Sequence, residues 1–128
     1  MSSLSSNATP AWDCDLLVVG SGAGALSTAV TAAHLGLKVI VVEKDPHYGG
    51  TTAWSGGWMW IPRNHLALQA GIAEPIEKPL SYLRHELGEQ FDETRARAFL
   101  TQGPRMVRFF EEHTALQFID GNLIPDFH

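Results

Sequence analysis

The residues of this chain whose types and spacing could do chemistry are a group of glycines after one apolar run and a glutamate after the next. The first apolar run stops at Gly20, and two more glycines, Gly22 and Gly24, follow at once. The second run ends at Glu43, 23 residues after Gly20. A strand, a glycine turn, a helix, a second strand and an acid in this order are typical of a dinucleotide site.

Each position of the glycine turn has a physical role in such a site. Gly20 allows a tight turn off the strand, Gly22 lets the backbone touch a pyrophosphate, and Ala25 stands at the third glycine position of the fingerprint. Backbone N–H groups and the positive end of the helix dipole then face the phosphates. A carboxylate at Glu43 can accept both hydroxyls of an adenosine ribose and repels a 2′-phosphate. The alternative is a helix-packing glycine turn that binds nothing.

A second glycine-rich stretch, residues 49–57, follows the acid directly. Eight of the twelve glycines lie between Gly20 and Gly57. An NAD-binding domain has no need of this second stretch, whereas FAD is longer and its pyrophosphate and ring need further backbone donors. The stretch therefore favours FAD over NAD. The alternative is a glycine loop that merely lets the tryptophans pack.

The elements that must position these residues form a β-α-β unit. We expect strands at residues 13–19 and 37–42, joined by a right-handed crossover helix over residues 23–35 that ends at a left-handed Gly36. The unbroken apolar run at residues 16–19 predicts a strand that is buried on both faces. Helical spacing predicts that four residues of the crossover helix face the sheet: Ala23, Leu26, Val30 and Ala33.

The remainder of the chain predicts a mainly helical segment. Residues 51–62 hold three of the four tryptophans and are expected to be buried, lining something flat and aromatic. Helices are expected at residues 64–70, 79–87 and 92–113, the last kinked or split at Gly103–Pro104. Its predicted apolar face is Phe99, Met106, Val107 and Phe110, and a short strand is expected at residues 116–119.

The fold class is therefore α/β, a Rossmann-like FAD-binding β-α-β unit followed by helices, in an incomplete domain. We expect three parts. Residues 1–12 form a disordered tail, and residues 13–62 form the FAD-binding unit with the second glycine stretch. Residues 63–128 form a truncated helical segment at the start of the substrate side.

Composition excludes several other classes of protein. The 128 residues are 45% apolar with a net charge of −5, and no basic patch indicates a nucleic-acid partner. No apolar run is long enough to span a membrane, and the first ten residues lack the regions of a signal peptide. Cys14 is the only cysteine, which excludes an internal disulfide, and no histidines pair at metal-ligand spacing. A cytoplasmic setting and no metal are expected.

These motifs resemble the FAD-binding flavoproteins of the fumarate reductase and succinate dehydrogenase family, and within it the 3-ketosteroid dehydrogenase branch. The resemblance rests on Gly-Ser-Gly-Ala-Gly-Ala, Val-Val-Glu-Lys, Gly-Gly-Thr-Thr-Ala-Trp-Ser-Gly-Gly and the Trp60-Ile61-Pro62 that follows. It implies hydride transfer, with a proton, between a substrate C–C bond and flavin N5. It also implies a cofactor site, in which the residues of the first turn contact the pyrophosphate, Glu43 contacts the ribose and the residues after it continue along the flavin. In chain order these residues are Gly20, Ser21, Gly22, Ala23, Gly24, Ala25, Glu43, Lys44, Gly50, Thr51, Thr52, Ser55, Gly56 and Gly57.

Two departures from the family refine this expectation. Membrane-bound members attach flavin through a histidine, and the matching position here is Gly50, so FAD should be non-covalent. Steroid-dehydrogenating members carry a tyrosine in a segment that resembles Pro125-Asp126-Phe127, and phenylalanine has no hydroxyl to donate. The small-molecule substrate is therefore a steroid or another enoate or enone. His128 is a candidate to approach it, and the catalytic residues are unknown.

Proteins of this family are several hundred residues long. We therefore expect this chain to be an N-terminal fragment, inactive alone, poorly soluble and weak in binding FAD, because two strands do not make a stable sheet. An NAD-binding module and an inactive remnant are the alternatives.

Overall fold

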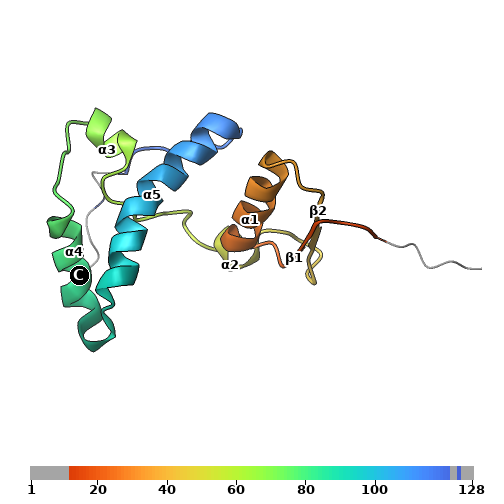
Figure 1. Cartoon of the computed structure of the whole chain (residues 1–128), viewed down its shortest axis with the longest axis horizontal. Coiled ribbons are helices and arrows are strands. Elements are labelled where there is room, and N and C mark those ends of the chain that lie inside the picture. Colours follow the sequence, from red (N-terminus) through yellow and green to blue (C-terminus); the bar gives the residue numbers. More distant parts are fainter. Residues whose placement is uncertain (1–11, 122–123, 125–128) are drawn as a thin grey trace, which may run out of the picture. The chain divides into compact units, whose positions relative to one another are not determined.

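The computed structural model describes residues 12–121 and Ile124. Contacts divide the chain into two compact units, Met1–Trp58 and Met59–His128 (Figure 1). The division falls four residues before the boundary expected at 62/63. All but Trp12 of the expected tail lies outside the described residues, as do residues 125–127 and His128. In the described part of the chain, no helix is both long and apolar enough to cross a bilayer.

The first unit is built on a parallel pair of strands. Strand β1 (Leu16–Val19) leads into helix α1 (Ala23–His34), which returns the chain to strand β2 (Val39–Val42). The strands pair in register from Leu16 with Val39 to Val19 with Val42. Gly36 has a φ of 85°, so the predicted left-handed end of the helix is confirmed. An α/β unit with a two-stranded parallel sheet and several helices is thus present.

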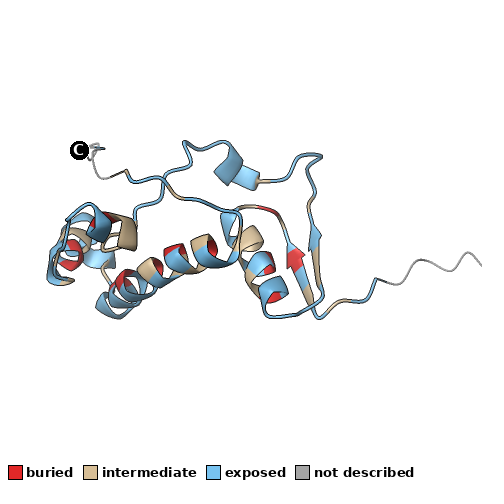
Figure 2. Cartoon of the chain, turned by 90° about the horizontal axis from the view of Figure 1, so that it is seen from above, coloured by how far each residue is buried: buried red, intermediate tan, exposed pale blue. Residues whose placement is uncertain are grey.

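Burial in this unit differs from the prediction in two ways. The sheet-facing stripe of α1 is centred on Ala29 and Ala32, while the predicted Val30 is exposed, as are Ala23 and Ala33. Small alanines let the helix lie close to the strands, so the buried stripe follows them rather than the larger side chains. In β1, Val18 is buried but Val19 is 78% exposed. The expected burial of both strand faces is wrong, because α1 covers one face only among the described residues (Figure 2).

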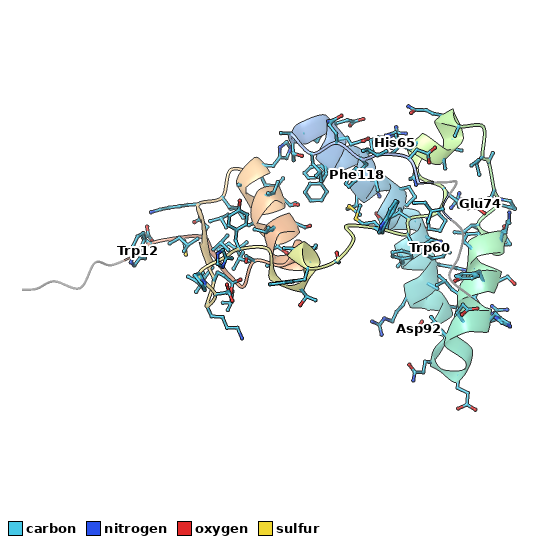
Figure 3. The ribbon with its side chains drawn as sticks, turned by 180° about the vertical axis from the view of Figure 1, so that it is seen from behind. Trp12, Trp60, His65, Glu74, Asp92 and Phe118 are labelled. Atoms are coloured by element: carbon cyan, nitrogen blue, oxygen red, sulfur yellow. The ribbon has the colours of Figure 1, made fainter. Side chains whose placement is uncertain are left out.

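The tryptophan-rich stretch is also more exposed than predicted. It begins with the short helix α2 (Gly50–Ala53), and residues 51–60 are all exposed. Trp54 is 92% exposed and Trp58 is 70% exposed, so the expected burial is wrong. The described part of the first unit offers these two rings no surface to pack on. Trp60, labelled in Figure 3, belongs to the second unit. It stacks on Phe99, with ring centroids 6.1 Å apart and an interplanar angle of 14°.

The second unit is helical, as the sequence predicts. It contains α3 (His65–Gln69), α4 (Glu77–Leu87), the 3-10 turn η1 (Gly88–Gln90) and α5 (Glu93–His113). Helix α4 begins two residues before the predicted start, because Pro79 fits within its first turn. The core joins α4 to α5 through Leu80, Ala96 and Leu100, with Ile76, Leu83 and Phe91 packed around them.

Helix α5 is one continuous helix of 21 residues, so the expected split at Gly103–Pro104 does not occur. Proline removes one backbone hydrogen bond, but the packed face of the helix holds it together. Gly103 is buried, and a Cβ there would lie 3.0 Å from Ile61 Cγ2. The buried residues recur every three or four positions: Ala96, Leu100, Gly103, Val107 and Phe110. Two of the predicted face residues lie outside this stripe, because Phe99 is 39% exposed and Met106 is half-buried.

The predicted strand at residues 116–119 is absent, and these residues have no regular secondary structure. The described part of the second unit offers no strand for them to pair with. Instead, the Phe118 N–H donates to Glu111 Oε1 at 3.1 Å. This hydrogen bond ties the segment to α5, while Leu116 and Ile119 are exposed.

The N-terminal cap of α5 gives a first testable prediction. Asp92 accepts a hydrogen bond from the Arg95 N–H at 3.1 Å. Replacing Asp92 with alanine should lower the free energy of unfolding by ~1 kcal/mol, because a helix donor loses its partner. Urea unfolding followed by circular dichroism measures this loss. Asp92→Asn should retain most of the stability, and Ser81→Ala, at an exposed site inside α4, should change it little; equal losses in all three would contradict a capping role.

Candidate functional site

A groove of about 540 Å³ lies at the carboxyl ends of β1 and β2. In open α/β sheets, ligands bind outside this edge of the strands. The ends of both strands, the turn after β1 and the start of α2 line the groove: Val19, Gly20, Ser21, Gly22, Val42, Glu43, Lys44 and Gly50. Six of these eight residues belong to the predicted cofactor site, so the fold brings its two glycine stretches and its acid to one place.

The glycine turn joins the two strand ends and starts α1. Gly20, with a φ of 95°, donates its N–H to the Val42 carbonyl at 2.7 Å. Gly22 is the N-cap of α1, and no side chain caps the helix from that position or places an acid in its first turn. The first N–H groups of a helix have no partner within it, and they attract negative charge. The start of α1 therefore presents backbone donors suited to a phosphate.

The second glycine stretch packs directly on the first. A Cβ on Gly50 would lie 3.1 Å from Gly22 Cα and 3.2 Å from Gly22 N, so any other residue would force the two backbones apart by a few tenths of an ångström. Gly50 also has a φ of 54°, in the region that favours glycine. Thr52 Oγ1 accepts the Ala23 N–H at 3.1 Å, which ties α2 to the start of α1.

Glu43 is held by a network of hydrogen bonds in the groove. Its Oε2 accepts the Ser21 hydroxyl at 2.5 Å, and its Oε1 accepts the backbone N–H groups of Lys44 at 2.7 Å and Asp45 at 3.0 Å. The Ser21 hydroxyl, in turn, accepts the Gly49 N–H at 2.9 Å. The hydrogen bond from Ser21, followed by that from the Asp45 N–H, lowers the pKa of Glu43 below its ordinary value. The carboxyl group is therefore ionised at neutral pH.

Other predicted site residues do not line the groove. Ser55 belongs to a local turn in which its hydroxyl donates to the Thr52 carbonyl at 2.8 Å and accepts the Gly57 N–H at 3.1 Å. The whole of that turn, with Thr51, is exposed: Ser55, Gly56 and Gly57. Gly24 and Ala25 lie in the first turn of α1. The contacts of these residues with a cofactor stay a prediction.

Sequence reasoning missed the part played by the residues after Glu43. The backbone N–H groups of Asp45 and Gly49 complete the network around the carboxylate and the Ser21 hydroxyl. The signal for the first of these was the Asp-Pro turn immediately after the acid, which folds the backbone back on the carboxylate.

The comparison with known families identifies the cofactor of this chain. The family of FAD binding domains matches residues 15–125, which include every residue that lines the groove. The chain belongs to the FAD-binding domain family. FAD is therefore its cofactor, as the second glycine stretch predicts.

Relatives of this FAD-binding domain include enzymes named as 3-oxosteroid and oxocyclohexene-carboxylate dehydrogenases. It is 46% identical over 103 residues to the 3-oxosteroid 1-dehydrogenase of Mycobacterium tuberculosis, covering 80% of this chain and 18% of the relative. It is 40% identical over 114 residues to the 4-oxocyclohex-2-ene-1-carboxylate 5-dehydrogenase of Sinomonas cyclohexanicum. This match covers 89% of this chain and 19% of the relative. The resemblance to the 3-ketosteroid dehydrogenase branch is thus confirmed, and the chain spans about a fifth of the length of these relatives.

A solved structure agrees with these relatives. The 3-ketosteroid Δ1-dehydrogenase of Sterolibacterium denitrificans, in complex with 1,4-androstadiene-3,17-dione, matches with a TM-score of 0.73 at 43% identity. The match covers 81% of this chain and 18% of that one.

The residues of the groove fit one end of FAD on physical grounds. Gly22 and Gly50 meet without a Cβ between them, so no side chain obstructs a phosphate that approaches their backbones. Glu43 is an anion at neutral pH, which suits ribose hydroxyls and opposes a 2′-phosphate. The groove thus has the donors and the acceptor that an adenosine diphosphate moiety requires.

A second pocket, of about 400 Å³, lies in the helical unit between α3 and α5. Beside it, His65 Nε2 lies 2.5 Å from Glu111 Oε2, and the His65 side chain is only 17% exposed. Within residues 12–121 and Ile124, no group of three potential metal ligands occurs.

Proposed function

We propose that this chain is the FAD-binding part of a flavin-dependent oxidoreductase that acts on a CH–CH group near the ketone of a cyclic substrate. The observation that carries the proposal is the groove in which Gly22, Gly50 and the ionised Glu43 meet. The names of the relatives support the substrate class, because a 3-oxosteroid and a 4-oxocyclohexene carboxylate share a ring ketone.

Different residues bind different parts of the cofactor. The backbone at Gly22 and the first turn of α1 bind the pyrophosphate, and Glu43 binds the adenosine ribose. The exposed turn at residues 55–57 contacts the flavin end. When bound, the flavin supplies hydride exchange with a substrate carbon. FAD is held without a covalent bond, because Gly50 stands where covalent members of the family carry their histidine.

Equilibrium dialysis of the purified chain against FAD, NAD⁺ and NADP⁺ tests the cofactor assignment. We expect retention of FAD in preference to both nicotinamide cofactors, and full release of FAD when the protein is denatured in acid. Glu43→Gln should weaken FAD binding, because a neutral amide is a poorer partner for ribose hydroxyls than a carboxylate. Preferential retention of NAD⁺ would identify a nicotinamide module, and retention of none would indicate an inactive remnant.

The reaction class is tested in the protein in which this sequence extends to the length of its relatives. Under anaerobic conditions, a 3-ketosteroid or a 4-oxocyclohexane carboxylate should bleach the visible flavin absorbance in a stoichiometric titration. A saturated analogue without the ketone is the control and should leave the spectrum unchanged. Bleaching by neither ketone would overturn the proposed substrate class.

A further inference from the structure

The Ser21 side chain is a buried polar group at the centre of the groove. It is 2% exposed and lies in the first glycine stretch, directly after Gly20, and its hydroxyl reaches Gly49 in the second. A buried hydroxyl is costly unless it is hydrogen-bonded, and this one has a partner on each side. Its hydroxyl donates a hydrogen bond to Glu43 Oε2 and accepts one from the Gly49 N–H. Ser21 therefore connects the acid after β2 with the stretch that leads into α2.

The hydrogen-bonding capacity of a hydroxyl limits what else Ser21 can do. A serine hydroxyl has one proton to donate and two lone pairs that accept. The proton is committed to Glu43, and one lone pair is committed to the Gly49 N–H. While these bonds hold, the side chain has no proton left for a phosphate oxygen. Any contact of Ser21 with a pyrophosphate must therefore come from its backbone.

The same accounting applies to the Glu43 carboxylate. An ionised carboxylate has about four lone-pair positions. Backbone N–H groups of Lys44 and Asp45 occupy Oε1, and the Ser21 hydroxyl occupies one position of Oε2. At most one position, on Oε2, is open to a ligand. This is fewer than the two that a paired contact with both ribose hydroxyls requires.

We propose that Ser21 is a positioning residue that fixes the Glu43 carboxylate so that it accepts a single hydroxyl of the FAD ribose. This inference rests on the proposed function, because it concerns how the same groove selects the adenosine end of FAD. Ser21 acts through Glu43 and through the Gly49 backbone, and its side chain does not bind the phosphates. Pre-ordered in this way, the carboxylate loses little conformational freedom when the cofactor binds.

Replacing Ser21 with alanine tests the positioning role. The dissociation constant for FAD, measured by flavin fluorescence at neutral pH, should rise about tenfold, the size expected for a hydrogen bond to a charged group. Ser21→Cys, which keeps nearly the same volume but donates weakly, should behave like the alanine variant. Ser27→Ala, in α1 and outside the groove, is the matched control and should bind FAD as the wild type does.

The pH dependence of binding separates positioning from mere packing. The Ser21 hydrogen bond lowers the pKa of Glu43, so the wild-type carboxylate stays charged as the pH falls until the pH reaches that lowered value. Without this bond the pKa rises towards the ordinary value, and FAD binding should be lost at a higher pH in Ser21→Ala than in the wild type. A weaker but unshifted pH profile would overturn the proposal.

Two FAD analogues test whether Glu43 accepts a single hydroxyl of the adenosine ribose. One lacks the 2′-hydroxyl of the adenosine ribose and the other lacks the 3′-hydroxyl. One analogue should bind about tenfold more weakly than FAD, while the other should bind nearly as well. Equal losses for both would mean that Glu43 accepts both hydroxyls and would overturn the proposal.

The wild-type chain supplies a measurement that needs no variant. In NMR titrations without ligand, the Gly49 amide resonance should shift with the same midpoint as the Glu43 carboxyl carbon, because the Ser21 hydroxyl links them. Independent midpoints would overturn the link even if Ser21→Ala failed to fold. A wild-type chain that binds no FAD but shows the shared midpoint would refute the proposed function and leave the network intact.

Discussion

Replacing Gly50 with alanine is expected to reduce FAD affinity at least tenfold. The added Cβ would lie 3.1 Å and 3.2 Å from two backbone atoms of Gly22, and neither atom can move without displacing the start of α1. Alanine at this position would also be strained by the backbone φ of 54°, at a cost of roughly 1–3 kcal/mol. Both effects separate the two glycine stretches that line the groove. Flavin fluorescence titration measures the loss.

Gly36→Ala is the matched control for this variant. Gly36 also has a positive φ, of 85°, but a Cβ there would meet no atom within 4 Å. It therefore shares the backbone strain of Gly50→Ala without the clash, and it lies at the end of α1 away from the groove. The control should lose stability and keep its FAD affinity; equal affinity losses in both variants would mean that contact with Gly22 is not the cause.

The largest loss of stability is expected from Leu100→Ala. Leu100 is 1% exposed and packs with Leu80 and Ala96 at the centre of the helical unit. Removing a fully buried leucine side chain costs about 2–5 kcal/mol, because the transfer free energy is lost and a cavity remains. This is a large fraction of the stability of a small unit. Urea unfolding followed by circular dichroism should show the helical signal lost at a lower midpoint.

Leu87→Ala is the corresponding control. It makes the same chemical change on α4, but Leu87 is 45% exposed. Its unfolding midpoint should move much less than that of Leu100→Ala. If both changes cost the same, the core would not be centred where α4 and α5 meet.

The features that the sequence predicts well are those with local causes. The strand pair and crossover helix follow from two apolar runs and the small residues between them, and Gly36 ends the helix where a left-handed residue is needed. Asn64 and Asp92 cap α3 and α5 as their types indicate. The proximity of Gly20, Ser21 and Glu43 also follows, because parallel strands place their carboxyl ends at one edge.

The features that the sequence predicts poorly depend on what each residue meets in space. Hydrophobicity suggested that Trp54 and Trp58 are buried, but burial needs a covering surface, and the described residues provide none. Gly103–Pro104 suggested a kinked or split helix, yet the helix is continuous and the glycine makes room for Ile61. The close approach of Gly50 to Gly22 had no local signal either. This approach depends on the packing of α2 against the start of α1, which only the structure reveals.

The anchoring of the tryptophan-rich stretch has a consequence for protease sensitivity. Its first part is tied to the start of α1 through Thr52, and its last part is held in the helical unit by Ile61 against Gly103. Between these anchors, Trp54 and Trp58 are strongly exposed and flank two glycines. Exposed backbone of this kind is where proteases cut first. A protease that cleaves after aromatic residues would therefore cut at Trp54 or Trp58 and separate the glycine-rich unit from the helical unit, with a further cut expected at Tyr48, which is 83% exposed.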